Sequence, residues 1–338
     1  MAATESTSSV RHLINSVFGK LIFLSLFILT GCAMSKIDEP VQSHIPTHQH
    51  AFVLQNAFLD VHLVTPSHPA GGVDAVRFDQ TARVTNLKYK GIELLDERGM
   101  PDEFGLLGIG VLGYEDGDDT FVKLGVGQLK RNKPQQYHFG TAYPLQALAD
   151  TRIEFVGPHE IQLVQTFNHV SKYSYVYRKK ISIDPQASVL KFDYALENHG
   201  QDEMTFDTYN HNFFKMGEGA IGSRLHFNPG FIPAYLSTDR LLLDEQGVSF
   251  SRDLLAPQTI FLPFLGNEKP FADAAILTDR YAGIKASIKH VPSPLHFTFF
   301  ADSKAIAPEY FIRLTVKPQD AVTWQRTYTF ESVSPVIP

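Results

Sequence analysis

The feature that most constrains this chain is a strict alternation of apolar and polar residues in the middle of the sequence. The alternation runs through residues 161–168, 173–178 and 190–197. Successive side chains of a β-strand point to opposite faces of a sheet, so a period of two predicts half-buried strands. Turn-forming sequences interrupt it, among them Asp184-Pro185 and Asn198-His199-Gly200. The sequence therefore predicts antiparallel β-structure.

The rest of the chain supports an all-β fold. No long segment after residue 50 has helical spacing of its apolar residues, and no seam rich in proline or serine divides it. The 26 phenylalanines and 13 tyrosines suit pleated, half-buried surfaces. We expect one large antiparallel β-sandwich over residues 51–338.

The N-terminus has the layout of a secretory signal. Arg11 and Lys20 precede an apolar run over residues 21–29, which is too short to span a bilayer of roughly 20 apolar residues. The run leads into Leu29-Thr30-Gly31-Cys32, which resembles the bacterial lipobox. We predict a signal peptide over residues 1–31 and lipidation of Cys32, the alternative being an ordinary buried cysteine.

Residues 32–50 are polar, contain prolines and show no sustained period, which predicts a flexible tether behind the lipid anchor. The residue after Cys32 is Ala33 and not the aspartate that retains lipoproteins in the inner membrane. By resemblance to Gram-negative sorting, we expect the protein to be anchored in the outer membrane of the cell envelope. A net charge of −6 argues against nucleic acid or an anionic lipid surface as partners.

The densest group of reactive side chains is the segment 207–214, where Tyr209, Asn210 and His211 follow the paired strands. An imidazole titrates near neutral pH and can give or take a proton during turnover. Amides can bond hydroxyls, and aromatic faces suit the C–H faces of sugars. The alternative is a core histidine that bonds to the backbone.

Three further segments are candidates. Glu309 lies just before an alternating strand, where it could act as a base or could be an edge-strand glutamate that discourages sheet extension. Arg77 offers a planar fork for carboxylates or vicinal hydroxyls, or a structural pair with Asp79. His138, between Tyr137 and Phe139, lies at the start of another expected strand.

Several classes of site have no signature in the sequence. The run Gly125-Val126-Gly127 lacks the third glycine and the helix of a dinucleotide site. The sequence also contains no Gly-x-Ser-x-Gly elbow, no His-Glu-x-x-His and no phosphate loop. We therefore expect no cofactor and no metal.

Together these features resemble the galactose mutarotase-like superfamily, which includes aldose 1-epimerases. The resemblance lies in the strand run 173–197, the turn Asn198-His199-Gly200 and an Asn-His-x-x-Phe motif formed by Asn210, His211 and Phe214. It implies that His211 is the general acid. Residues 314–330 look like the closing hairpin of the family.

The catalytic glutamate of the family lies one strand before that hairpin, and Glu309 is its nearest counterpart. Arg77 and His138 match family positions by their order along the chain. Two features depart from the family: the early His-Gly-Gly loop is missing, and Glu309 stands in Ala-Pro-Glu-Tyr rather than Glu-x-Gln.

The resemblance implies interconversion of sugar anomers. Glu309 would take the proton of the anomeric hydroxyl while His211 protonates the ring oxygen, across a cleft about one pyranose wide. Arg77, His138, Tyr209 and Asn210 would bind the sugar.

Two alternatives remain. The first is a surface lipoprotein that binds glycans without turning them over. The second is a lyase or epimerase of uronic-acid polymers, with Arg77 against the carboxylate and Tyr209 or His211 as base.

Overall fold

The computed structural model describes residues 50–65, 73–132, 136–168, 172–215, 223–226, 231–233, 240–244, 247–266, 275–279 and 282–334. Of these residues 60% lie in strands, and they include one helix, α3 (Val73–Arg77). The all-β prediction is confirmed. The described residues belong to one compact unit, Ile45–Pro338. The predicted signal peptide, Cys32 and nearly all of the tether lie outside them.

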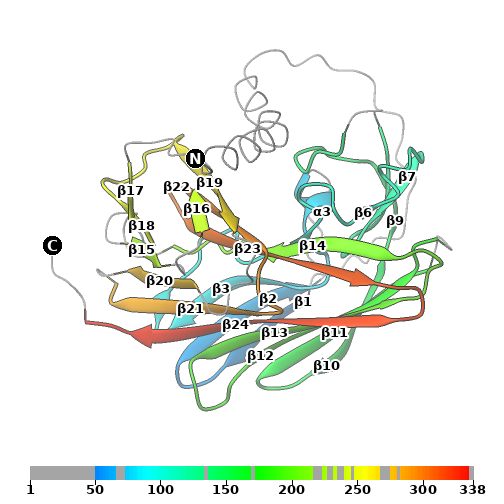
Figure 1. The fold of residues 1–338 in the computed structure, drawn as a ribbon. Helices are drawn as coiled ribbons and strands as arrows, with labels where there is room; N and C mark the ends of the chain where they lie inside the picture. Colours follow the sequence, from blue (N-terminus) through cyan, green and yellow to red (C-terminus); the bar gives the residue numbers. More distant parts are fainter. Residues whose placement is uncertain are drawn as a thin grey trace, which may run out of the picture. The chain divides into compact units, whose positions relative to one another are not determined.

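Two large sheets dominate this unit (Figure 1). The strands of the ten-stranded sheet are, in spatial order, β10 (Asp150–Val156), β11 (Glu160–Phe167), β12 (Tyr175–Ile183), β13 (Val189–Asn198), β24 (Ala321–Ser332), β21 (Ile284–Val291), β20 (Ala275–Asp279), β15 (Ser223–His226), β18 (Gly247–Phe250) and β17 (Leu241–Asp244). Those of the six-stranded sheet are β16 (Phe231–Pro233), β19 (Thr259–Gly266), β22 (His296–Asp302), β23 (Ile306–Val316), β14 (Met204–Asn210) and β5 (Asp102–Phe104).

Two four-stranded sheets complete the described architecture. Their strands are β1 (His50–Gln55), β2 (Leu59–Thr65), β3 (Arg83–Tyr89) and β4 (Ile92–Glu93) in one, and β6 (Val111–Leu112), β7 (Thr120–Lys123), β8 (Gly127–Lys130) and β9 (Leu145–Leu148) in the other. Among the residues that the structure describes, no helix is long and apolar enough to cross a membrane.

The alternation seen in the sequence becomes the two faces of the ten-stranded sheet. In β12 and β13 every second residue is buried along the whole strand. The two strands pair antiparallel in one continuous register, from Tyr175 opposite Asn198 to Ile183 opposite Leu190. Their buried faces meet the six-stranded sheet, as the layering of β14 and β23 against β13 and β24 in Figure 1 illustrates.

An aromatic cluster fills the space between the two sheets. Trp324 of β24 stacks on Tyr194 of β13 with ring centroids 5.0 Å apart. From the six-stranded sheet, Phe104 meets Trp324 edge-on at 6.2 Å, and Phe206 packs beside it at 5.6 Å. Edge-to-face and offset pairs are the arrangements that aromatic quadrupoles favour.

The turn after β13 has a specific need for glycine. An added Cβ on Gly200 would lie 2.4 Å from the carbonyl oxygen of Lys172, so a side chain does not fit. The Asn198 side chain closes the turn by accepting a hydrogen bond from the Gly200 amide and donating to the carbonyl of Val316. The turn Asn198-His199-Gly200 therefore has a structural role, because the Asn198 side chain joins the end of β13 to β23.

Three local predictions were wrong. Residues 314–330 do not form a hairpin, because β23 belongs to the six-stranded sheet and β24 to the ten-stranded one. Glu309 lies inside β23, between β22 and β14, and so is not an edge-strand residue. His138 lies in a turn region ahead of β9 rather than at the start of a strand.

Candidate active site

The candidate site lies on the face of the six-stranded sheet that points away from the ten-stranded sheet. Alternation along β14 turns Tyr209 to this outer face, and His211 continues the pattern just past the strand end. On the neighbouring strand β23, Glu309 and Phe311 occupy the same face. Their contacts with Tyr209 and His211 place residues about 100 positions apart side by side.

The predicted acid and base are in direct contact. Nε2 of His211 lies 2.9 Å from Oε1 of Glu309, and the two side chains are 7% and 3% exposed. The other carboxylate oxygen of Glu309 accepts a hydrogen bond from the hydroxyl of Thr298 on β22. The cleft one pyranose wide that we expected between His211 and Glu309 is absent, because the two groups bond to each other.

Aromatic rings enclose the imidazole. The ring of Phe213 stacks on His211 at a centroid distance of 3.7 Å and an angle of 16°. Phe300 meets it edge-on at 5.7 Å and Phe78 at 6.4 Å. Nδ1 of His211 is buried and has no hydrogen-bond partner. The ring plane is therefore set by packing, and Nε2 is the nitrogen that faces a partner.

A second polar cluster lies beside this pair, around the fully buried carboxylate of Glu103 on β5. Its Oε2 accepts hydrogen bonds from the Tyr209 hydroxyl at 2.6 Å and from Nε of Arg77 at 2.9 Å. Nζ of Lys123 lies 3.5 Å from Oε1 and donates to the hydroxyl of Tyr137 at 2.7 Å. Arg77 thus pairs with Glu103, and the predicted alternative pair with Asp79 does not form.

Burial and charge set the protonation of this cluster. Burial lowers the pKa of Lys123 to about 8, although Glu103 opposes that shift. Burial also acts against the charge of Arg77, but Tyr209 and Glu103 raise the pKa of its guanidinium overall. Burial, followed by the Glu103 carboxylate, holds the pKa of Tyr209 well above its ordinary value. The Tyr209 hydroxyl therefore stays protonated at neutral pH.

His138 lies at the rim of this cluster. Its exposed ring stacks on Phe139 at 4.9 Å, and Phe139 in turn lies under the Arg77 guanidinium at 4.6 Å. Nδ1 of His138 accepts a hydrogen bond from the Gly140 amide. Of the predicted sugar-binding residues, Arg77 and Tyr209 thus contact each other directly. His138 is connected to Arg77 only through Phe139.

Asn210 does not join them. It points from β14 into the space between the sheets, where it donates to Asp102 at 3.1 Å and accepts from the Tyr328 hydroxyl at 3.1 Å. Asp102 also pairs with Lys179 at 2.6 Å and with Arg326. With a residue exposure of 1%, Asn210 is a core residue on the opposite face from His211.

The ion network around Asp102 is completed by Asp79, which lies 3.2 Å from the same lysine. Burial raises the pKa of Asp79. Burial opposes ionisation of Asp102 as well, but Lys179 and Arg326 hold its pKa below the ordinary value. Two acids and two bases thus form a buried network that ties β5 and β14 to β12 and β24.

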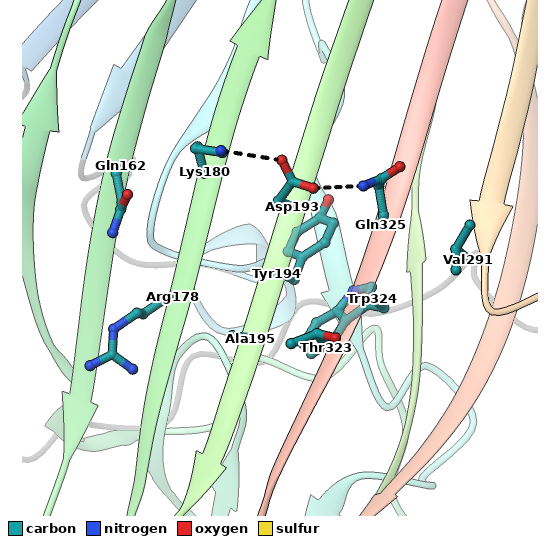
Figure 2. Close-up of a pocket in the computed structure, with 10 residues that line it drawn as sticks. All are labelled: Gln162, Arg178, Lys180, Asp193, Tyr194, Ala195, Val291, Thr323, Trp324 and Gln325. Atoms are coloured by element: carbon teal, nitrogen blue, oxygen red, sulfur yellow. Dashed lines mark hydrogen bonds and ion pairs between the residues drawn. The ribbon is translucent and has the colours of Figure 1, made fainter.

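A hollow of about 390 Å³ lies elsewhere, on the outward face of the ten-stranded sheet (Figure 2). Its polar side chains bond to one another: Gln325 donates to Asp193 at 2.7 Å, and Lys180 lies 3.7 Å from the same carboxylate. None of the predicted site residues lines it. This hollow and the pair of His211 and Glu309 therefore lie on different sheets.

Sequence reasoning missed Glu103, which contacts Arg77 and Tyr209, and Thr298, which contacts Glu309. It also missed Lys123 of β7, which contacts Glu103. No motif surrounds any of the three, and the pairing of β5 with β14 and of β22 with β23 brings in Glu103 and Thr298. A detectable signal was the polar residue at a buried position, as in Asp102-Glu103-Phe104. Among the described residues, no group of three or more His, Cys, Asp or Glu could hold a metal ion.

Solved structures share this fold. A putative aldose 1-epimerase from Escherichia coli K12 matches with a TM-score of 0.54 and 12% identity, over 85% of this chain and 100% of that one. A galactose mutarotase related enzyme from Lactobacillus acidophilus gives 0.52 and 14%, over 86% and 100%. A galactose mutarotase-like protein from Clostridium acetobutylicum gives 0.54 and 12%, over 86% and 98%.

The chain therefore has the galactose mutarotase-like fold, as the resemblance implied. No protein-family model matches the sequence, and no curated protein matches it. At these identities the likeness establishes the architecture, and the chemistry has to be argued from the site itself.

Proposed function

We propose that this protein is a carbohydrate-active enzyme that interconverts the α and β anomers of an aldose, with His211 as acid and Glu309 as base. The observation that carries the proposal is their contact at 2.9 Å on one face of the six-stranded sheet. The anomeric oxygen and the ring oxygen of a pyranose are bonded to the same carbon. An acid and a base that touch each other can therefore serve both oxygens from one side of the sugar.

The reaction balances without a cofactor. Glu309 takes the proton of the anomeric hydroxyl while protonated His211 gives one to the ring oxygen, and the bond between C1 and the ring oxygen breaks. The open-chain aldehyde rotates about C1–C2. On closure from the other face, His211 takes its proton back from the attacking hydroxyl and Glu309 returns one to the new anomeric oxygen.

The surroundings suit this role. Thr298 fixes one oxygen of Glu309 and leaves the other toward His211. The side chains of the pair are 7% and 3% exposed and bond to each other, so the sugar must replace that bond with bonds to its own oxygens. The half-buried aromatic rings of Phe139 and Phe300 offer apolar surface for a sugar face beside the pair.

The same contacts weigh against the uronic-acid lyase. That reaction needs Arg77 to neutralise a substrate carboxylate, but Glu103 and Tyr209 already hold the guanidinium. The raised pKa of Tyr209 also removes one of the two candidate bases.

Polarimetry of freshly dissolved aldoses tests the proposal. Each proton-transfer group contributes about 10²–10⁴-fold in rate, so His211→Asn and Glu309→Gln should each lose most of the catalysed rate. His199→Ala and Glu203→Gln, two exposed positions, are matched controls that should keep it. If no aldose is accelerated but saturable binding is seen by calorimetry, the glycan-binding lipoprotein takes the place of the enzyme.

We also propose that Cys32 anchors the protein to the cell envelope, as Leu29-Thr30-Gly31-Cys32 indicates. Several acyl chains on one cysteine can hold a protein stably where one chain gives marginal binding. In a bacterial host, the wild-type chain should fractionate with membranes and Cys32→Ser should not. Mass spectrometry that finds an unmodified Cys32 in the mature protein would refute the anchor.

A further inference from the structure

We infer that Arg98 and Phe213 are positioning residues that hold the imidazole of His211 in its productive orientation. The inference rests on the proposed function of His211 as the acid. The sequence did not point to Arg98. Phe213 lies in the segment 207–214, but nothing in the sequence assigned it a role in orienting His211.

The first step is a three-layer stack. Phe213 lies 3.7 Å from the His211 ring centroid, and the guanidinium carbon of Arg98 lies 4.0 Å from the Phe213 centroid. Two planar groups this close to one ring cannot share a face without overlap. Phe213 is therefore sandwiched between Arg98 and His211.

The second step is what holds Arg98. Its Nε donates to Asp96 at 2.6 Å, and its two terminal nitrogens donate to Asp302 at 2.6 and 3.1 Å. Asp302 is itself fixed at the end of β22 by the backbone amides of Lys304 and Ala305. Two carboxylates from different segments thus fix the plane of the guanidinium, as a planar fork allows.

The third step is the backbone on which Phe213 sits. The amide of Asp96 donates to the carbonyl of Phe213 at 3.0 Å, and the amide of Phe213 donates to the carbonyl of Gly99. Backbone hydrogen bonds therefore join the segment of Arg98 to the segment of Phe213 and His211. They involve both the amide and the carbonyl of Phe213.

The consequence for His211 follows from its own bonds. Among the described residues, Nδ1 of His211 has no hydrogen-bond partner, and Nε2 has one, Glu309. A single hydrogen bond does not stop the ring from rotating about it. Stacking on Phe213 supplies the missing restraint. A misplacement of about 1 Å can cost on the order of 10²-fold in rate, so the stack is worth a measurable part of kcat.

The experiment compares variants of the full chain by anomerisation kinetics and by NMR of the histidine ring nitrogens, with His211→Asn assigning the signal. Phe213→Leu and Arg98→Ala should lower kcat on the order of tenfold to a hundredfold, with KM near the wild-type value. Both should also shift the His211 ring signals. Phe213→Tyr keeps the stack and should keep kcat.

Arg98→Lys keeps the charge but not the planar fork, so it should behave like Arg98→Ala. Arg178→Ala, an arginine paired with Glu197 on the other sheet, is the matched control and should change neither readout. If Arg98→Ala fails to fold, Phe213→Leu carries the test. Unchanged ring signals and unchanged kcat in folded Phe213→Leu would overturn the inference.

The ring signals separate this inference from the proposed function. If the wild type accelerates no aldose, the assignment of His211 as an anomerisation acid fails. A shift of the ring signals in Phe213→Leu would still support the stack as what orients His211, and no shift would refute it.

Discussion

The two faces of the six-stranded sheet use the same strands for opposite purposes. On the outer face, Tyr209 and His211 contact Glu103 and Glu309, and the rim of the cluster is half-buried. On the inner face, Asn210 bonds to Asp102 within a network that is sealed between the sheets. Adjacent residues of one short segment therefore belong to a candidate active site and to the core.

The difference shows how a strand separates chemistry from structure. Polar groups on the inner face bond to one another, and these bonds connect β5, β14, β12 and β24. On the outer face, Nδ1 of His211 has no hydrogen-bond partner among the described residues. His211 and Glu309 bond to each other there, and a sugar could replace that bond. The following predictions test this division, from the largest expected effect to the smallest.

The inner network should respond strongly to the loss of one charge. Lys179→Met removes the cation that Asp79 and Asp102 share, and Arg326 remains as a partner of Asp102. Breaking a buried pair typically costs about 3–5 kcal/mol. Lys180→Met, the next residue on the other face of β12, removes only a partly exposed pair and should cost about 0–1 kcal/mol. Urea denaturation of both variants checks this, and equal losses would break the comparison.

Asn210 should matter for stability and not for turnover. Asn210→Ala leaves Asp102 and Tyr328 each without one buried hydrogen bond, which costs about 1–3 kcal/mol. Its kcat and KM, per folded molecule, should equal those of the wild type. A raised KM with unchanged stability would return Asn210 to the sugar-binding role that the sequence predicted.

Thr298 should have an effect that is confined to the outer face and appears in turnover. Thr298→Val removes the hydrogen bond to Oε2 of Glu309, and a bond to a charged group contributes about 1.5–3 kcal/mol. We expect kcat to fall about tenfold with little change in KM. Thr205→Val, which loses an exposed bond to Thr315, is the control. A fall in both variants alike would remove the special role of Thr298.

Lys123 should give the outer face a weak pH dependence of stability. Its pKa is about 8 in the folded chain and 10.5 in a model peptide, so between these values the unfolded chain binds more protons. Stability should therefore rise with pH over this window, by at most about 1.4 kcal/mol per pH unit.

Unfolding free energies of wild type and Lys123→Met at pH 7.5, 8.5 and 9.5 check the sign. Tyrosines of the unfolded chain ionise near pH 10, at about the upper end of this range, but they are common to both proteins, so their contribution cancels in the difference. The difference between the two proteins should shift in favour of the wild type as the pH rises. A difference that shifts the other way would mean that the folded chain holds the proton of Lys123 more tightly than the unfolded one.

The sequence was a good guide to the strands, because a period of two is written in neighbouring residues. It pointed to His211 through a local motif and to Glu309 through its place along the chain. The two side chains are in contact, and their catalytic roles stay a prediction. It was a poor guide to Asn210, which was expected beside His211 in the sugar site because the two are neighbours in sequence. Alternation along the strand instead places Asn210 on the opposite face of the sheet. Glu103 and Arg98 could not be found, because only strand pairing and a long-range salt bridge to Asp302 bring them to the site.

The central claim is that His211 and Glu309 act as one acid–base unit, and exchange NMR of a dissolved aldose between its two anomers tests it most directly. Groups that act as a unit are not additive, so the double variant His211→Asn/Glu309→Gln should be no slower than either single variant. The single variants break a buried pair and are expected to lose stability, so all rates are compared per folded molecule. Independent, multiplicative losses, or a wild-type rate in either single variant, would contradict the claim.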